Sequence, residues 1–228
     1  MTHKCPLLLI SVISVLVILL YGCSPIITAT PDPSIAWADD FEDGDIEDWV
    51  EPTPGRYFFV HEGVLRAVLT TNIYRSGTLG FYRTGILGHE SKVSEGTWSF
   101  DLFFSDDKDA NYFLVLSCDE DYKFGFGVST MSMDNTSVSI RALSHGIWSP
   151  GEVANLGRRL TGWHHFDVTR DALGNSRLYL NRELVVEHKD DLSISPHWFI
   201  LDVKETGPAF DNLVVRNRVI DFQPIEME

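Results

Sequence analysis

Three acidic residues near the start of the mature chain, Asp40, Glu42 and Asp43, are the first group whose types and spacing could do chemistry. Carboxylate oxygens suit Ca²⁺, which takes about six to eight oxygen ligands from carboxylates, carbonyls and water. The run from Asp43 to Asp45 lacks the spacing and the glutamate of an EF-hand loop, so that kind of site is excluded. The alternative is a solvated acidic turn that holds no metal.

Glycoside hydrolysis is a second chemistry to consider, and it needs two carboxylates that flank the bond. They lie about 5–5.5 Å apart when configuration is retained and further apart when it is inverted. The run 119–121 holds three adjacent acids in a turn, and Glu183 and Glu187 are too widely spaced to match. Acids contributed by different strands keep a hydrolase open as an alternative.

Other catalytic groups have weak support. His164 and His165 are adjacent, and adjacent residues of a strand point to opposite faces, which argues against a zinc pair. We expect one of them to be buried beside Trp163 and the other exposed. Ser105 lacks the glycines of a nucleophile elbow, and no phosphate loop or dinucleotide fingerprint is present.

Tryptophans suggest a sugar site, which combines an aromatic platform with acids, amides and arginines that bond the hydroxyls. Trp148 lies in a segment, 145–151, that is a loop by composition and is therefore expected at the surface. Trp198 alternates with Ile200 and Asp202, so the three share one face of a strand. We predict ligand binding by Trp148, Trp198 and Asp202. The tryptophans assigned to the core are Trp49, Trp98 and Trp163.

The first 22 residues have the layout of a secretory signal. Residues 1–4 are polar with one cation, and the apolar run 7–20 is shorter than the about 20 residues that span a bilayer. The run ends at Leu20-Tyr21-Gly22-Cys23, which resembles the bacterial lipobox and implies lipidation of Cys23. We therefore predict a lipoprotein signal peptide (1–22) and a lipidated cysteine with a flexible Pro-, Ser- and Thr-rich tether (23–34). The alternative is an uncleaved membrane anchor.

Either way, the rest of the chain is expected to lie outside the cytoplasm, in the extracellular space or the periplasm. Of the three cysteines, Cys5 leaves with the signal and Cys23 carries the lipid. Cys118 then has no partner for an intrachain disulfide. It ends an apolar stretch, which predicts a buried, inert thiol.

Net charge limits the partners. The chain carries 18 Lys and Arg against 33 Asp and Glu, a formal charge of −15. Nucleic acid binding depends on a basic surface, so no nucleic acid partner is expected. Electrostatic docking on anionic lipid is also disfavoured, which leaves the lipid anchor as the contact with the membrane. An acidic surface suits solubility, divalent cations and neutral ligands such as glycans.

The sequence after the tether has the pattern of an all-β domain. In the run 97–103, Trp98, Phe100 and Leu102 share one face of a strand, while Thr97, Ser99 and Asp101 share the other. No stretch keeps helical spacing for three turns. Gly125 and Gly127 share a face and leave room there for a neighbour or a ligand. The other predicted strands are 57–60, 64–69, 112–116, 122–128, 137–143, 163–169, 177–180, 183–188, 198–203 and 209–215.

Three segments resemble a known family. They are GWHHFDVTRDALGNSRLYLNRELVVEH at 162–188, FEDGDIEDWVEPTPGRYFFVHEGVLRA at 41–67, and AFDNLVV at 209–215. The first is similar to laminin-G-like domains of the concanavalin A-like lectin/glucanase superfamily, and the others resemble the opening and the closing strand of bacterial members. Arg182 stands where glycine is common. The resemblance implies a two-sheet antiparallel jelly-roll sandwich over 35–217, followed by a C-terminal tail at 218–228.

In a sandwich the first and last strands usually pair, which would place Phe41 beside 210–214 and the acidic run beside Asp211. Related jelly-roll modules commonly hold a structural Ca²⁺ between these two parts, so the resemblance implies a calcium site with Glu42 and Asp211 as first ligands, joined by Asp40 and Asp43. The superfamily's hydrolases carry alternating acids on one strand, Glu-x-Asp-x-(x)-Glu, and this chain has no such run.

These observations favour a surface lipoprotein with a non-catalytic β-sandwich that binds carbohydrate or another cell-surface ligand. The alternative is an extracellular carbohydrate-active enzyme, hydrolase or lyase, of the same fold, because the superfamily contains both.

Overall fold

The computed structural model describes ten parts of the chain: residues 32–51, 57–68, 85–106, 111–118, 122–132, 135–144, 147–148, 151–194, 198–203 and 209–222. The chain divides into two units, 1–32 and 33–228, and the second is the one that these residues describe. Within these ranges no helix is long and apolar enough to cross a membrane. The predicted signal peptide and Cys23 lie outside the described residues.

Sixteen strands and no α-helix are found in the described residues. The strands are β1 (Ile35–Asp39), β2 (Trp49–Val50), β3 (Phe58–His61), β4 (Val64–Ala67), β5 (Gly85–Glu90), β6 (Gly96–Phe104), β7 (Asn111–Cys118), β8 (Tyr122–Ser132), β9 (Asn135–Ser144), β10 (Ile147–Trp148), β11 (Glu152–Asn155), β12 (Gly162–Arg170), β13 (Asn175–Leu180), β14 (Glu183–Lys189), β15 (Trp198–Val203) and β16 (Ala209–Arg216).

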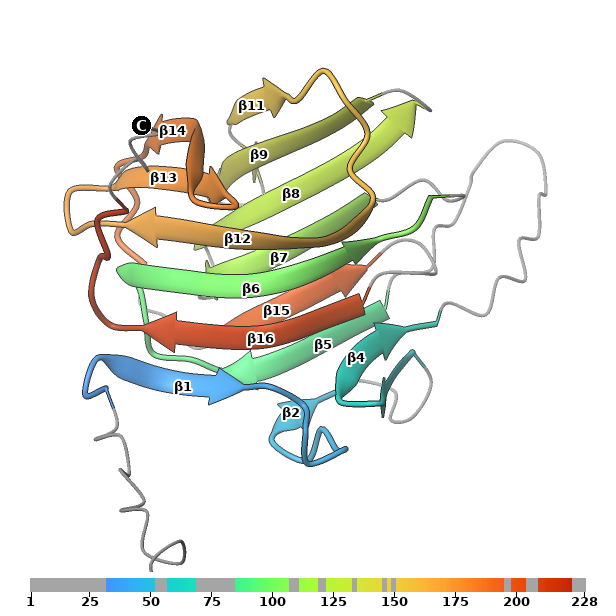
Figure 1. Ribbon diagram of the computed structural model, residues 1–228. Coiled ribbons are helices and arrows are strands. Elements are labelled where there is room, and N and C mark those ends of the chain that lie inside the picture. Colours follow the sequence, from blue (N-terminus) through green and yellow to red (C-terminus); the bar gives the residue numbers. More distant parts are fainter. Residues whose placement is uncertain are drawn as a thin grey trace, which may run out of the picture. The chain divides into compact units, whose positions relative to one another are not determined.

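The strands form two antiparallel sheets of eight strands each, stacked as a sandwich (Figure 1). Sheet A has the order β14-β13-β12-β6-β16-β4-β3, with β1 also paired to β16. Sheet B has the order β10-β9-β8-β7-β15-β5-β2, with β11 also paired to β9. The predicted all-β jelly-roll sandwich is therefore confirmed.

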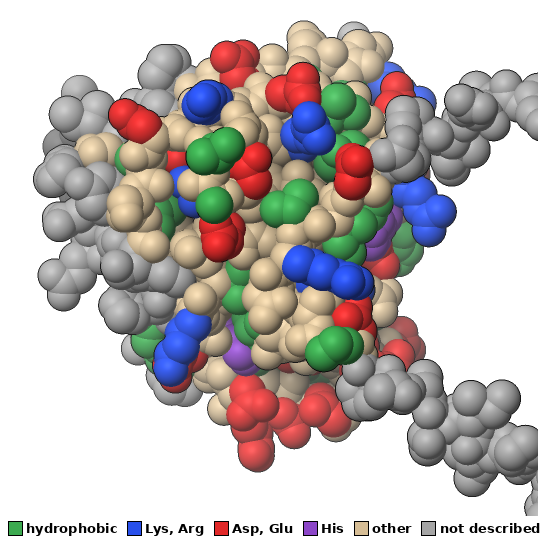
Figure 2. Space-filling view, turned by 90° about the vertical axis from the view of Figure 1, so that its left-hand side faces the viewer, with side chains coloured by type: hydrophobic (Ala, Val, Ile, Leu, Met, Phe, Trp, Pro, Cys, Tyr) green, Lys and Arg blue, Asp and Glu red, His purple; other side chains and the backbone are tan. Residues whose placement is uncertain are grey.

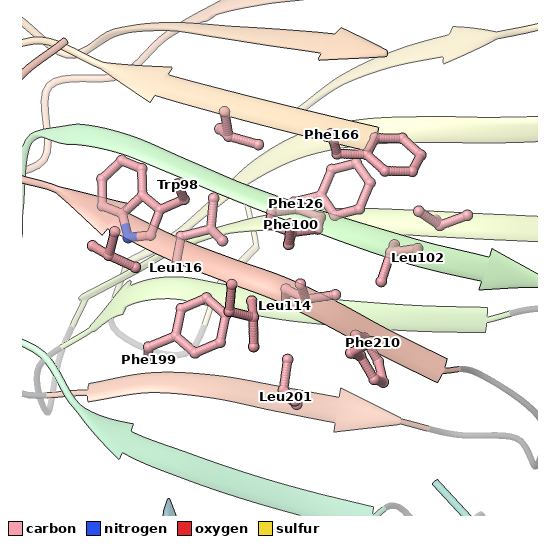
Figure 3. Close-up of a cluster of buried hydrophobic side chains, with 14 of the residues drawn as sticks. Trp98, Phe100, Leu102, Leu114, Leu116, Phe126, Phe166, Phe199, Leu201 and Phe210 are labelled. Carbon is pink, nitrogen blue, oxygen red and sulfur yellow. The ribbon is translucent and has the colours of Figure 1, made fainter. Parts of the chain in front are cut away.

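The core lies between the sheets and follows from alternation along the strands. On β6 the side chains of Trp98, Phe100 and Leu102 are fully buried. Figure 3 shows them facing side chains of the other sheet, including Phe126 and Phe199. Burial of each such side chain contributes about 1.5–3 kcal/mol relative to exposure, which is why the alternating pattern fixes the fold class.

The first and last strands pair, but the first strand begins earlier than expected. Trp37 of β1 lies opposite Val215 of β16. Phe41 follows the strand, adopts a positive φ of 54°, and buries its side chain completely. The expectation that Phe41 itself pairs with the closing strand is wrong, because the amide of Phe41 donates to Asp39 Oδ1 (2.8 Å) and turns the chain there.

The turn between β13 and β14 shows how Arg182 is accommodated at a position where glycine is common. Asn181 and Arg182 have φ values of 50° and 71°, so both lie in the left-handed region that a two-residue type I′ hairpin requires. The side-chain oxygen of Asn181 accepts a hydrogen bond from the backbone amide of His165 (3.0 Å), which holds the turn in place without glycine.

The room beside Gly125 and Gly127 is filled by the chain itself. A Cβ atom at Gly125 would lie 2.7 Å from Cζ of Phe113, and a Cβ atom at Gly127 would lie 3.3 Å from the same ring. The two glycines therefore let the Phe113 ring lie close to β8. The neighbour that the glycines accommodate is Phe113.

A buried ion pair fastens the end of β12 to the segment after β14. Arg170 Nη2 donates to Asp190 Oδ1 (2.6 Å), and Nε donates to Oδ2 (3.2 Å). The remaining guanidinium nitrogen, Nη1, donates to the Ser94 carbonyl (2.9 Å), so the pair is both shielded and well hydrogen-bonded. The two side chains are 5% and 4% exposed.

Candidate functional site

The outer face of sheet B carries the predicted residues Trp198 and Asp202. Along β15 the side chains of Phe199, Leu201 and Val203 are fully buried, so Trp198 and Asp202 point away from the core. Trp198 is 37% exposed, and its ring lies against the backbone of β5 at Gly88. Because Gly88 has no side chain, the indole can lie this close to β5; a Cβ atom there would be 3.3 Å from Cε3 of Trp198.

Strand register supplies the neighbours of Trp198. Ile200 lies opposite Gly88, which also pairs with Val50 of β2, while Asp202 lies opposite Ile86. Val50 and Ile86 are 54% and 39% exposed. We call this surface, made of Val50, Ile86, Trp198, Ile200 and Asp202, the Trp198 face. This face presents one aromatic ring, exposed aliphatic side chains and one carboxylate.

Two acids with register positions on this side of β5 and β15 do not form a catalytic pair. Glu90 is opposite Trp198, whereas Asp202 is opposite Ile86, four residues away along β5. Four residues span about 13 Å of strand. Glycosidase carboxylates lie about 5–9.5 Å apart. The described part of the Trp198 face thus lacks a hydrolytic acid pair.

Trp148 was expected to lie in a loop, but the structure places it in a strand. It belongs to β10, a two-residue strand that pairs with the end of β9, with Trp148 opposite Leu143. Leu143 pairs with Lys123, Lys123 with Cys118, and Cys118 with Trp198. The two tryptophans therefore occupy the ends of one transverse row of sheet B, about 19 Å apart at the usual strand spacing. The side chain of Trp148 lies outside the described residues.

Cys118 agrees with the sequence prediction of a buried thiol. It is 4% exposed, and its Sγ donates to the carbonyl oxygen of Trp198 at 3.6 Å.

The acidic residues proposed for calcium form a turn between β1 and β2. Asp40 Oδ1 accepts from the amide of Glu42 (3.2 Å), and Asp43 Oδ1 accepts from the amide of Asp45 (3.3 Å). The carboxylate of Glu42 lies against Gly63, where a Cβ atom would be 2.8 Å from it. Acidic side chains gather at the lower end of the molecule in Figure 2, where this turn lies.

Asp211 lies near two of these acids. Its pKa is raised, first by burial and then by the negative charges of Asp101, Glu42 and Asp40. Among the described residues, no three His, Cys, Asp or Glu side chains are arranged to hold a metal ion. The calcium site remains a prediction.

A polar cluster that the sequence did not predict lies on the outer face of sheet A. His165 of β12 bonds Asp101 of β6 through Nδ1 (2.6 Å) and Asp167 through Nε2 (3.2 Å). The hydrogen bonds that His165 donates to Asp101 and then to Asp167 raise the pKa of His165 to about 9. Ser99 Oγ donates to Asp167 Oδ1 (2.6 Å), and this carboxylate is buried.

The closing strand completes this cluster. Asp211 of β16 lies opposite Asp101, and the side-chain amide of Asn212 donates to Asp101 Oδ2 (2.8 Å). Burial by itself raises the pKa of Asp101, but the hydrogen bonds from His165 and Asn212 outweigh it, and the pKa is lowered.

The two adjacent histidines do face opposite sides, as alternation predicted. His164 packs against Phe104 (ring centroids 5.8 Å apart), and burial lowers its pKa. Neither histidine is fully buried. The assignment of Trp163 to the core is wrong: Trp163 is 46% exposed and packs edge-on against Phe103 on the outer face of sheet A. Trp49 and Trp98 are core residues, at 6% and 0% exposure.

No protein-family model and no curated protein matches this chain. Solved structures match its fold. A carbohydrate-binding module from Bacillus subtilis has a TM-score of 0.55 at 14% identity, over 74% of this chain and 95% of that one. The β-glucanase of Bacillus licheniformis has a TM-score of 0.59 at 12% identity, over 82% and 100%.

A third match is a prokaryotic β-1,3-1,4-glucanase from a mouse hindgut metagenome, with a TM-score of 0.59 at 11% identity, over 79% of this chain and 98% of that one. At these identities the likeness concerns the fold alone. Together with the two stacked antiparallel sheets, it shows that the chain has the concanavalin A-like jelly-roll fold.

Proposed function

We propose that this protein is a lipid-anchored, non-catalytic carbohydrate-binding module that holds a neutral polysaccharide on its Trp198 face. The observation that carries the proposal is the exposed indole of Trp198 on the outer surface of sheet B, on the same face of β15 as Asp202 and in one transverse row with Trp148. A glycan chain laid across the strands would follow that row.

The chemistry of the face fits sugar rings. An indole offers a flat apolar surface to the C–H groups of a pyranose, and carboxylates accept hydrogen bonds from its hydroxyls. Glu90 lies directly opposite Trp198 on β5, and Asp202 lies four residues along β15 from it. A formal charge of −15 opposes polyanionic chains, so a neutral or cationic polysaccharide is the expected ligand.

The structural neighbours support carbohydrate as the ligand class, since they include a binding module and β-glucanases. The absence of a suitably spaced acid pair from the described part of the Trp198 face favours binding over cleavage.

The test is retention of the full-length protein, solubilised in detergent, on immobilised β-1,3-1,4-glucan and on a glycan array. Trp198→Ala should lose most of the binding. Leu173→Ala removes a more exposed apolar side chain (74%) from the β12–β13 turn and should bind like the parent. No binding by the parent on any neutral glycan, or equal binding by Trp198→Ala, would refute the proposal.

The enzymatic alternative has one specific observation in its favour. Asp101 and Asp211 lie opposite each other on adjacent strands, and directly opposed residues place their Cβ atoms about 4.5–5.5 Å apart. One pKa is lowered and the other raised, which is the division expected of a base and an acid. Release of reducing or unsaturated ends from a polysaccharide, abolished by Asp211→Asn, would establish this alternative and overturn the non-catalytic proposal.

The anchor belongs to the same proposal. A lipid on Cys23 would hold the module at a membrane surface facing outside the cytoplasm, with the tether 23–34 giving it reach. Such a protein would collect glycan at the cell surface.

A further inference from the structure

Two aromatic rings on sheet B lie where glycines leave room for them. The ring of Trp198 on β15 lies against Gly88 of β5. The ring of Phe113 on β7 lies across two glycines of β8: a Cβ atom would be 2.7 Å from Cζ of Phe113 at Gly125 and 3.3 Å from Cδ2 at Gly127. Since opposite edges of the Phe113 ring reach two glycines of one strand, this ring lies low over β8.

Both rings are on the outside of the sandwich. Leu114 and Phe124, the chain neighbours of Phe113 and Gly125, are fully buried in the core, so Phe113 and Gly125 point the other way by alternation. Phe113 is half-buried and Trp198 is 37% exposed. Each ring therefore offers part of its surface to a ligand.

Strand register brings the two rings into one line. Ile200 of β15 lies opposite Gly88 on one side and opposite Val115 of β7 on the other. Val115 lies opposite Gly125, which lies opposite the exposed Arg141 of β9. We call these five positions, from Gly88 to Arg141, the aromatic strip. One ring covers its first position and the other its fourth, three strand spacings or about 14 Å apart.

The surroundings of the aromatic strip favour a sugar chain. Ile200 and Val115 make the strip apolar between the rings, while Glu90 and Asp202 place a carboxylate on each side of it. A bilayer would have to desolvate these carboxylates, and an added peptide strand would need a sheet edge, whereas the strip crosses the middle of sheet B. Sugars present C–H faces to aromatic rings and hydroxyls to charged side chains.

We propose that the aromatic strip binds an extended neutral oligosaccharide, with one sugar stacked on Trp198, a second and non-adjacent sugar stacked on Phe113, and Arg141 bonding hydroxyls beyond it. This inference rests on the proposed function and deepens it, because it adds the minimum length of the glycan and the residues that set it. A single sugar is too short to touch both rings. The chain crosses the strands, parallel to the row that joins Trp198 to Trp148.

The test is calorimetric titration of the full-length protein in detergent with oligosaccharides of increasing length. The probes are the disaccharides to hexasaccharides of β-1,3-1,4-glucan, cellulose, mannan and fructan. In at least one series the affinity should rise with length until the chain spans both rings and then level off, because two linked contacts bind more tightly than either contact alone.

Phe113→Leu is the decisive variant, since it keeps an apolar side chain over Gly125 and Gly127 but removes the planar ring. It should weaken hexasaccharide binding by at least about tenfold, because the second of two linked contacts is lost. Disaccharide binding should change much less, because a disaccharide can use Trp198 alone. The matched control is Phe59→Leu, the same substitution at a 43% exposed ring on sheet A, which should bind every probe like the parent.

Arg141→Ala tests the far end of the strip independently. The Arg141 side chain is exposed, so its removal should leave the melting temperature unchanged. It should weaken binding of the hexasaccharide and leave that of the disaccharide unchanged. Thermal melting checks the fold of every variant, and Arg141→Ala decides the question if Phe113→Leu does not fold.

Three results would overturn the inference. They are equal affinity of the parent for disaccharides and hexasaccharides, hexasaccharide binding by folded Phe113→Leu that matches the parent, and failure of every probe to bind. In the first two cases, binding that is still lost in Trp198→Ala would leave the proposed function standing. In the third, retention on the glycan array decides separately whether the proposed function stands.

Discussion

The imidazole Nδ1 of His165 lies 2.6 Å from Oδ1 of Asp101, and this contact joins two neighbouring strands, β12 and β6, through their outer faces. Since the sequence places the two residues 64 positions apart, the contact exists only in the folded chain. Its electrostatic consequence can be measured.

The first prediction is a pH dependence of stability. The pKa of His165 is raised to about 9 from 6.5, mainly by the hydrogen bond that His165 donates to Asp101. A group whose pKa is higher in the folded state stabilises the fold fully below its unfolded pKa and loses this contribution as pH rises through its folded pKa. We expect the melting temperature to fall between about pH 6.5 and 9 and this fall to be reduced in His165→Gln. A His165 ring that titrates near 6.5 by NMR would contradict the argument.

The second prediction concerns the buried ion pair. Asp190→Ala leaves the Arg170 guanidinium buried without its counter-charge, so we expect a loss of about 3–5 kcal/mol in the free energy of unfolding. The matched control is Glu187→Ala, which breaks the exposed pair with Arg177 and should cost less than about 1 kcal/mol. Urea denaturation measures both, and equal small losses would show that the buried pair contributes little.

The third prediction separates a core tryptophan from a surface one. Trp98 is fully buried and Trp198 is 37% exposed. Trp98→Ala should destabilise the fold by about 3–5 kcal/mol, as large-to-small core substitutions do. Trp198→Ala should change the melting temperature little and weaken glycan binding. A Trp198→Ala variant that loses as much stability as Trp98→Ala would make Trp198 a packing residue.

The fourth prediction is a calcium dependence, which rests on the acids Asp40 and Glu42 near Asp211. A ligand present at 100 times its dissociation constant stabilises the native state by about 2.7 kcal/mol. If calcium binds here, chelation should lower the melting temperature of the parent and leave that of Asp211→Ala unchanged. An unaltered melting curve in excess chelator would remove the calcium site.

The fifth prediction concerns Cys23. Cys23→Ala should block lipidation, so that the protein either remains as an unprocessed precursor or is released from the membrane. Membrane fractionation and the mass of the N-terminal peptide measure this directly. Unchanged leader cleavage and membrane retention in Cys23→Ala would contradict the lipoprotein assignment.

Several features of the fold could be predicted from local pattern. The alternation of Trp98, Phe100 and Leu102 with polar residues placed those three in the core, because an antiparallel strand with one buried face repeats every two residues. The same rule was available for Trp163, which shares its face with His165 and Asp167. The exposure of Trp163 was therefore predictable from the alternation. The prediction was wrong because it assumed that a large aromatic side chain is buried.

The register of the paired strands and their order in the sheets could not be predicted from the sequence. Alternation states which face of β6 carries Asp101, but not that β12 and β16 are its neighbours, since pairing between distant segments depends on how both sheets close around one core. For the same reason the sequence marked Trp198 and Asp202 as sharing a face, yet did not indicate the row that joins Trp198 to Trp148.

The sequence by itself thus determined the alternation of faces along strands such as β6, the all-β class, and the acidic balance that disfavours nucleic acid. These depend on composition and on a period of two residues, which are local properties. Only the tertiary structure decided that Asp101, His165, Asp167 and Asn212 form one cluster and that residues 218–222 wall a cavity beside it. A site assembled from three strands and a terminal segment is set by long-range packing, and no local pattern encodes the distance between its parts.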